Sequence, residues 1–373
     1  MSIPFGETGG LVRGCLDLAC GRFPLFVFGA PVGDLLPVFH FHDEPREDLE
    51  PKLRHLAENG YRTITADAIG AFVRGERTLP DRAVAICFDD AWASVWTDAG
   101  PLLKQYGLTA IVHAIPGRVS DAGGCRPAGV PASGSPFMTW PELRALQADG
   151  VLDVQSHTMT HARVFTASTI AGFVGPGYAA TPLLNRPRVG ASPLRFVGPG
   201  DLGAPLYEHR SRMSDGPRMQ DTEAGHDACV RLVAAEGGPA FFARPDWRSR
   251  LQSVAEQASR QIAPEPDDTH QRAIEEELSA SRDELNLRLA TRAVNHICLP
   301  WGVSGRTTAA VLERLGFATA FANRLPGVHA VRRGDDPHWL KRLPNRYIHR
   351  LPGRGRRWWF AALSSAGAAV GGR

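Results

Sequence analysis

The sequence is poor in cysteine and carries no large excess of charge of either sign. Its six cysteines, spread over 373 residues without the paired spacing of a zinc knuckle, argue against a disulfide framework and a cysteine-rich metal module. The formal net charge is only +3, which gives no general reason to expect a nucleic-acid partner. Hydrophobic residues make up 43% and charged residues 22%, which is typical of a globular protein with a sizeable core.

The chain also lacks an uninterrupted run of about 20 apolar residues, so the sequence predicts no transmembrane helix. The first apolar stretch, LFVFGAPVGDLLPVF, is broken by glycine, proline and Asp34. It also begins too far along the chain, after Arg13 and Arg22, to resemble a secretory signal. We therefore expect a cytoplasmic protein.

The end of the chain is rich in arginine and aromatic residues. The stretch WWFAALSSAGAAVGG follows a basic cluster and is a candidate for peripheral contact with an anionic membrane surface. The alternative is a tail that frays or packs on its own domain. The sequence leaves the oligomeric state open.

A repeated pattern of helix, glycine and strand indicates the fold. An amphipathic helical stretch, a glycine and a short apolar strand follow one another in residues 48–65, 95–115, 139–156 and 307–322. Further strand candidates are LLPVFHF, RAVAICFDD and NHICLPW. About seven such strands predict a distorted, closed or nearly closed (β/α)7 barrel. The alternative is an open doubly wound sheet, but no glycine-rich nucleotide motif follows the first strand.

Residues 165–290 interrupt this pattern with segments rich in glycine, proline and arginine, followed by a charged helical stretch. A loop of this length without structure is improbable in a compact domain, so we expect an inserted, mainly helical cap near the active face. The alternative is a mobile excursion without a part in the chemistry. The expected organisation is therefore an N-terminal extension (1–36), a barrel (37–164 and 291–345), an inserted cap (165–290) and a basic and apolar tail (346–373).

Polar side chains follow the predicted strands at the points where the strands end. They are His42, Asp89, Asp90, His157 and Trp301. The carboxyl ends of all strands open onto one face of a β/α barrel, so these distant residues are expected to meet there.

Two short motifs carry the chemistry. In FDD, the adjacent carboxylates Asp89 and Asp90 point in different directions, which suits one as a metal ligand and the other as a proton acceptor. In HTMTH, the rings of His157 and His161 share one side if the segment turns helically. Alone, FDD could be a helix cap and HTMTH two unrelated surface histidines. Together they form the two-histidine, one-carboxylate set of a catalytic zinc-type site.

These motifs resemble those of the polysaccharide deacetylase family, which shares the NodB homology domain. AICFDDAW resembles the TFDDG motif, SHTMTH the SHTxxH motif, and LPWG the YPYG motif. PVFHFHDEP is similar to the opening PVLMYH strand of the branch that deacetylates exopolysaccharides. The resemblance covers residues 37–164 and 291–345 and implies a distorted (β/α)7 barrel.

The resemblance implies a hydrolase that removes N-acetyl groups from an acetamido sugar in a polysaccharide or glycoconjugate. Asp90, His157 and His161 would hold a divalent metal ion, with zinc as the expected ion, and Asp89 would be the general base. The backbone N–H of Trp301 would help to hold the oxyanion. The late histidine motif of the family is not visible, and His42 is our candidate for the general acid.

The sequence also departs from the family pattern. Ala91 replaces the glycine of TFDDG, and Cys298 occupies the place of an arginine that orients the base in many members. Arg342 or Arg346 are candidates for that task. Because most relatives that act on polymers are exported, the absence of a signal points to an intracellular nucleotide-, lipid- or oligosaccharide-linked substrate, or to export by another route.

Two other functions stay open from the sequence. One is a hydrolase with the same barrel that acts on a non-sugar amide. The other is a glycan-binding protein that has lost turnover, for which Ala91 and Cys298 are the best support. The complete set of two aspartates and two histidines argues against the second.

Overall fold

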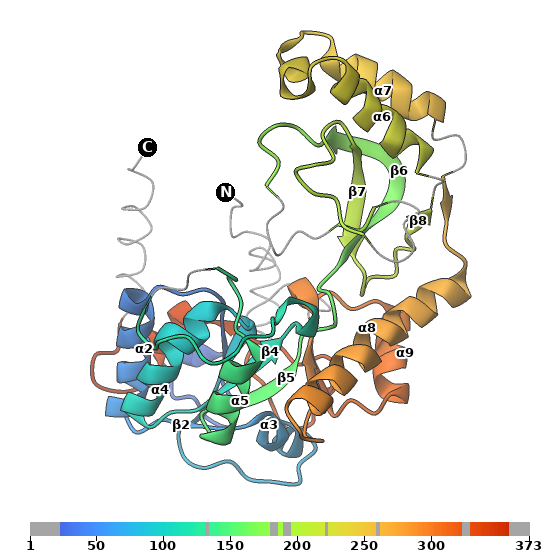
Figure 1. Cartoon of the computed structure of the whole chain (residues 1–373). Helices are drawn as coiled ribbons and strands as arrows, with labels where there is room; N and C mark the ends of the chain where they lie inside the picture. The colour runs from blue at the N-terminus through green and yellow to red at the C-terminus, as the bar shows by residue number, and fades with distance from the viewer. Residues whose placement is uncertain are drawn as a thin grey trace. The chain divides into compact units, whose positions relative to one another are not determined.

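The computed structural model describes residues 23–130, 134–179, 186–188, 195–220, 223–258, 262–322 and 329–357 (Figure 1). The described chain divides into two compact units. Unit 1 comprises the residues up to Met159, Leu278–Gly302 and the residues from Leu312 onward, and unit 2 comprises Thr160–Glu277 and Val303–Val311. Most of the expected extension and the apolar tail, residues 1–22 and 358–373, lie outside the described ranges. Within those ranges, no helix is long and apolar enough to cross a membrane.

Unit 1 is built on an eight-stranded sheet whose paired strands are parallel. The order is β11-β10-β5-β4-β3-β1-β12, and β2 pairs with the start of β3. The strands are β1 (Val38–Phe41), β2 (Arg62–Thr63), β3 (Ala83–Asp90), β4 (Ala110–Ala114), β5 (Leu152–Ser156), β10 (His296–Cys298), β11 (Thr319–Phe321) and β12 (Leu343–Pro344).

The two edges of this sheet are joined by the segment that leads into β12. The Leu340 N–H donates to the Ala320 carbonyl at 3.1 Å, and the Ala322 N–H donates to the Leu340 carbonyl at 3.0 Å. A few residues later, Leu343 pairs with Phe39 of β1. The sheet therefore curls round on itself, and the predicted β/α barrel is confirmed.

Helices alternate with these strands, and α2, α4 and α5 cover the outside of the sheet in Figure 1. The α-helices with residues in unit 1 are α2 (Arg46–Glu58), α3 (Ala66–Val73), α4 (Gly100–Tyr106), α5 (Trp140–Ala148), α8 (Asp267–Arg288) and α9 (Arg306–Arg314). Four glycines after helices, Gly60, Gly107, Gly150 and Gly316, have φ between 64° and 71°. Residues other than glycine adopt this left-handed backbone at a cost in free energy. The predicted pattern of helix, glycine and strand is therefore confirmed.

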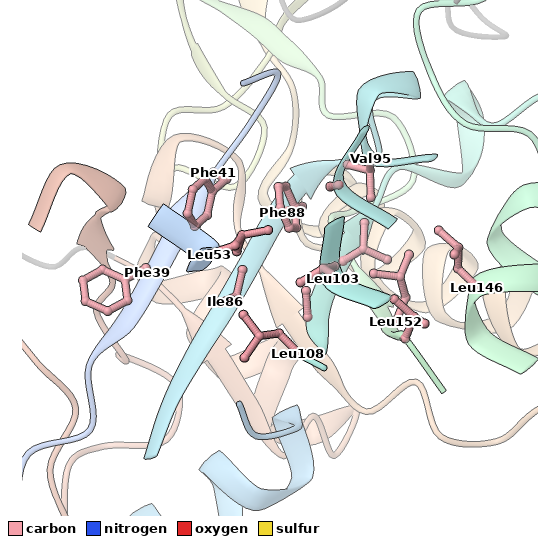
Figure 2. Close-up of a cluster of buried hydrophobic side chains, with 14 of the residues drawn as sticks. Phe39, Phe41, Leu53, Ile86, Phe88, Val95, Leu103, Leu108, Leu146 and Leu152 are labelled. Atoms are coloured by element: carbon pink, nitrogen blue, oxygen red, sulfur yellow. The ribbon is translucent and has the colours of Figure 1, made fainter. Parts of the chain in front are cut away.

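The core of unit 1 has a layer on each side of the sheet. Outside it, Phe41 and Phe88 stack at 5.1 Å between ring centroids and pack in one buried cluster with Leu53 of α2 and Leu103 of α4 (Figure 2). The alternate side chains of the same strands, such as Cys87 of β3, belong to a second buried cluster. Burial on both faces explains why these strands are nearly continuous apolar runs in the sequence.

Unit 2 contains an antiparallel pair, β6 (Arg163–Phe173) with β7 (Pro205–Ser211), and a short pair, β8 (Met219–Gln220) with β9 (Ala263–Pro264). Its helices include α6 (Ala224–Ala235), η5 (Gly238–Ala243) and α7 (Trp247–Ala258). The expectation of a mainly helical insertion therefore omitted the β6–β7 pair. Side chains such as Phe165 and Tyr207 form its buried core, which stabilises strands despite the surrounding glycines and prolines. The role of a cap stays a prediction.

Candidate active site and metal centre

The five predicted polar residues all lie at or just after the carboxyl ends of parallel strands. Asp89 and Asp90 are the last two residues of β3, and His157 follows β5 directly. His42 follows β1, and Trp301 lies in the short helix η6 (Pro300–Gly302) after β10. The order of the strands in the sheet thus brings residues from four distant segments to one end of the barrel.

Asp89 is buried and is held by Arg342, which lies one residue before β12. The guanidinium donates two hydrogen bonds, from Nη1 to Oδ1 at 2.6 Å and from Nη2 to Oδ2 at 2.7 Å. Burial alone would raise the pKa of Asp89, but the charge of Arg342 and the contact with His113 outweigh it and hold the pKa well below its usual range. Arg346 instead lies over the Tyr347 ring at 5.2 Å. Of the two arginines considered from the sequence, Arg342 is therefore the partner of Asp89.

His113 is a residue of the site that the sequence analysis missed. It stands in the middle of β4, is fully buried, and its Nδ1 lies 3.2 Å from Asp89 Oδ1. Burial lowers the pKa of His113 to about 4, so the neutral ring donates its Nδ1–H to the carboxylate. The signal was a histidine in an otherwise apolar strand, AIVHA, which also fits a structural core residue.

A second group of donors surrounds Asp90. Donor atoms of Asp90, His157 and His161 all lie within 4.8 Å of one another, and the three residues are buried. Nε2 of His157 is 3.4 Å from Asp90 Oδ1. The His157 Nδ1–H donates to the Cys298 carbonyl at 2.6 Å, which leaves Nε2 as the lone-pair nitrogen that a metal ion requires. The donor set fits a divalent metal ion of the zinc type.

The backbone that carries these donors is strained. Asp90, Thr158 and His161 have φ of 68°, 66° and 54°, in the left-handed region that residues other than glycine adopt at a cost. The segment from His157 to His161 is therefore a pair of bends and not the helical turn considered from the sequence, although both rings still join the donor set. This segment is also where the chain passes from unit 1 to unit 2, between Met159 and Thr160.

A second set of potential ligands, Asp89, His113 and Cys298, also has donor atoms within 4.8 Å of one another. Its carboxylate, however, already makes a two-bond ion pair with Arg342. A divalent cation there would lie beside a buried guanidinium, and the repulsion is large where the dielectric constant is low. The arrangement therefore favours Asp90, His157 and His161 as the metal set and leaves Asp89 as a separate carboxylate.

His42 lies on the open side of Asp89. Its Nε2 is 3.6 Å from Asp89 Oδ2, and its side chain is 50% exposed. Its ring meets His40 edge-on at 5.6 Å between centroids. Burial and the charge of Arg342 lower the pKa of His40 to about 3, so His40 is neutral near pH 7. His42 is thus the histidine that is both near Asp89 and accessible to a substrate.

Trp301 has a left-handed backbone, with φ of 56° and ψ of 14°. The turn around it is fixed by a hydrogen bond from the Gly302 N–H to the Leu299 carbonyl at 2.8 Å. The assignment of its N–H to an oxyanion stays a prediction.

A model of the polysaccharide deacetylase family matches residues 76–171, a segment that holds Asp89, Asp90, His157 and His161. Among curated proteins, YxkH of Bacillus subtilis, a candidate polysaccharide deacetylase, is 24% identical over 134 residues, which are 34% of this chain and 43% of the relative. The poly-β-1,6-N-acetyl-D-glucosamine N-deacetylase of Escherichia coli K12 is 26% identical over 117 residues, 30% of this chain and 17% of the relative. The chain thus spans less than half the length of these relatives.

Two solved structures share the fold. A de-N-acetylase from Aggregatibacter actinomycetemcomitans aligns with a TM-score of 0.51 and 15% sequence identity. The alignment covers 83% of this chain and 94% of the de-N-acetylase chain. The BpsB deacetylase domain of Bordetella bronchiseptica has a TM-score of 0.51 and 16% identity, covering 84% and 97%. The fold is therefore the β/α barrel of the deacetylases. The resemblance to the polysaccharide deacetylase family, in its exopolysaccharide-deacetylase-like branch, is confirmed.

Proposed function

We propose that the protein is a metal-dependent hydrolase that removes N-acetyl groups from an acetamido sugar in a polysaccharide or glycoconjugate. The observation that carries this proposal is that two adjacent carboxylates have different kinds of partner. Asp89 is neutralised by Arg342, whereas Asp90 stands among the donor atoms of His157 and His161. The family match and the name of the Escherichia coli relative support an N-acetylated glucosamine polymer or a related conjugate as the substrate.

Asp90, His157 and His161 would hold the metal ion, and zinc is the ion that their chemistry favours. When bound, a divalent ion there supplies Lewis acidity towards the amide carbonyl and towards a water molecule. The hydrogen bond from His157 to the Cys298 carbonyl fixes which ring nitrogen faces the ion.

The remaining residues move protons and hold charge. Asp89 accepts a proton from the attacking water, and Arg342 and His113 keep its carboxylate ionised and oriented. The Trp301 N–H donates to the oxygen that becomes negative in the tetrahedral intermediate. His42 donates a proton to the sugar nitrogen as the C–N bond breaks, which releases acetate and the free amine.

The test is acetate release from oligomers of β-1,6-linked N-acetylglucosamine by the zinc-supplied protein, with the new amines counted in parallel. The Asp89→Asn protein, checked for folding, is the control. Equal amounts of acetate and amine from the wild type alone support the proposal. Turnover of small non-sugar amides without acetate from any glycan would support the second hydrolase function, and binding of glycan without turnover would support a glycan-binding protein.

A further inference from the structure

A short helix before β1 exposes two large apolar side chains. The 3-10 helix η2 (Leu25–Phe28) turns Phe26 and Val27 into the core, where they are 0% and 6% exposed. Leu25 and Phe28 are each 50% exposed, and Phe23 stacks on Phe28 at 5.1 Å between ring centroids. Among the described residues few large apolar side chains are this exposed, so two within four residues form an unusual feature.

A basic segment is fastened beside this helix. Nη2 of Arg356 donates to the carbonyls of Phe26 at 2.9 Å and Ala30 at 2.8 Å. On either side of Arg356, the side chains of Arg354 and Arg357 are exposed. The segment that carries the two exposed arginines is therefore fastened to the segment that carries the two exposed apolar residues. We call Leu25, Phe28, Arg354 and Arg357 the apolar–basic patch.

The backbone of the basic segment is fixed to α2 as well. The Arg354 N–H donates to Asn59 Oδ1 at 2.6 Å, and Asn59 Nδ2 donates to the Arg354 carbonyl at 3.1 Å. Asn59 lies just after α2, where the chain turns into β2. The segment is thus anchored near the amino ends of the strands, whereas the predicted catalytic residues stand at their carboxyl ends.

We propose that the apolar–basic patch docks the protein on the surface of an anionic lipid bilayer. Leu25 and Phe28 would enter the boundary between head groups and acyl chains, and Arg354 and Arg357 would meet the lipid phosphates. The nearby Glu58, which acts on His55, offsets part of the positive charge without reversing it.

The apolar residues distinguish a bilayer from an acidic polymer. A soluble polyanion would need only the arginines, whereas half-exposed Leu25 and Phe28 gain free energy when an apolar phase covers them. The contact does not depend on the proposed reaction, because it uses no residue of the candidate active site.

The experiment is co-sedimentation of the full chain with vesicles of phosphatidylcholine alone and of phosphatidylcholine with phosphatidylglycerol. We expect binding to the anionic vesicles only. The Leu25→Ser, Phe28→Ser double variant should bind about tenfold more weakly or worse. The affinity of the Arg354→Ser, Arg357→Ser double variant should fall about 25-fold, because each arginine near an anionic surface contributes about fivefold.

Matched controls come from another part of unit 1. Leu287, 74% exposed on α8, is changed to serine, and the exposed Arg144 and Arg292 are changed together. These proteins should bind like the wild type, and all variants should keep the wild-type melting temperature. Unchanged binding of both patch variants would overturn the proposal. The proposal would also be overturned if soluble polyglutamate bound as strongly as anionic vesicles, both to the wild type and to the Leu25→Ser, Phe28→Ser variant.

Discussion

Two neighbouring carboxylates have different surroundings, and their predicted roles follow from that difference. Asp89 faces Arg342 and His113, and Asp90 faces His157 and accepts a hydrogen bond from the Trp92 indole at 3.0 Å. Burial of two such charges costs free energy unless each carboxylate is paired and hydrogen-bonded. The strand ends of the barrel supply the two sets of partners from different directions.

The role of Asp89 as general base is tested by the Asp89→Asn substitution. The amide keeps the shape of the side chain but cannot accept the proton, so turnover should fall by about 10²- to 10⁴-fold. Metal content should stay at the wild-type value, because Asp89 is not in the donor set. Acetate release and metal analysis on the same preparation measure both, and a near-normal rate would remove Asp89 from the mechanism.

Arg342→Lys tests the orientation of the base. Lysine keeps the charge but cannot make the two parallel bonds to Asp89, so the carboxylate should lose its fixed orientation. We expect kcat to fall by about tenfold to a hundredfold with unchanged metal content. The control is Arg346→Lys, whose arginine lies over Tyr347, and its kcat should stay close to the wild-type value. Equal kcat values for the two variants would refute the orienting role.

Ala91 tests the strain at the end of β3. Its φ of 55° is left-handed, and the family motif has glycine at this position. Ala91→Gly should relieve about 1–2 kcal/mol of backbone strain in the folded protein. Glycine also gives the unfolded chain more conformational entropy, which should cancel about 0.5–1 kcal/mol of this gain. The free energy of unfolding should therefore rise slightly. Ala93→Gly, at a buried position without positive φ, should destabilise by about 0.5–1 kcal/mol. Chemical denaturation measures both, and a loss of stability in Ala91→Gly would contradict the strain.

Sequence reasoning found the residues of this site that belong to motifs and missed those that do not. The types and spacing of His157 and His161, with a carboxylate at a neighbouring strand end, suggest a donor set, and the resemblance to the deacetylase family assigns Asp90 as that carboxylate. His113 was missed because one histidine in an apolar strand has no spacing to interpret. Arg342 was only one of two candidates, since the sequence does not reveal which of two nearby arginines points into the barrel.

At the scale of elements, the start of α5 is held by one buried carboxylate. Glu142 is fully buried and accepts bonds from the Thr139 N–H at 2.9 Å and from Nε and Nη2 of Arg126, each at 2.7 Å. Burial alone would raise the pKa of Glu142, but Arg126 and the two backbone N–H groups outweigh it and lower the pKa. The helix start and the loop that contains Arg126 are therefore joined through one charge.

This lowered pKa predicts a pH dependence of stability. Because the folded pKa is depressed, the ion pair stabilises the protein fully above the ordinary value of 4.5 and is lost as the pH falls through the folded value. Glu142→Gln should reduce the free energy of unfolding by about 3 kcal/mol near pH 7. The difference between wild type and variant should narrow below about pH 4.5. Denaturation at several pH values measures it, and a constant difference down to pH 3 would contradict the assignment.

The elements that repeat were predictable, and those that depend on long-range contacts were not. The four glycines after helices marked the ends of α2, α4, α5 and α9, because a left-handed residue is a local requirement. The joining of β11 to β1 through Leu340 was not visible, because a two-residue strand such as β12 has no pattern of its own. The β6–β7 pair was missed because glycine and proline surround its strands.

At the scale of the molecule, the donor set links metal binding to the stability of the fold. Asp90 comes from β3, and His157 and His161 follow β5, so an ion held by all three would stabilise the native state relative to the unfolded chain. Removal of the metal with a chelator should lower the melting temperature of the wild type and leave that of His161→Ala unchanged. Calorimetry with and without chelator measures this, and equal shifts in both proteins would contradict the link.

The claim that Asp90, His157 and His161 gather around one divalent ion is tested most directly by elemental analysis of protein purified in the presence of zinc. We predict about one zinc ion per chain in the wild type and in Asp89→Asn, and close to none in folded His161→Ala. Zinc retained by His161→Ala at the wild-type ratio would contradict the claim.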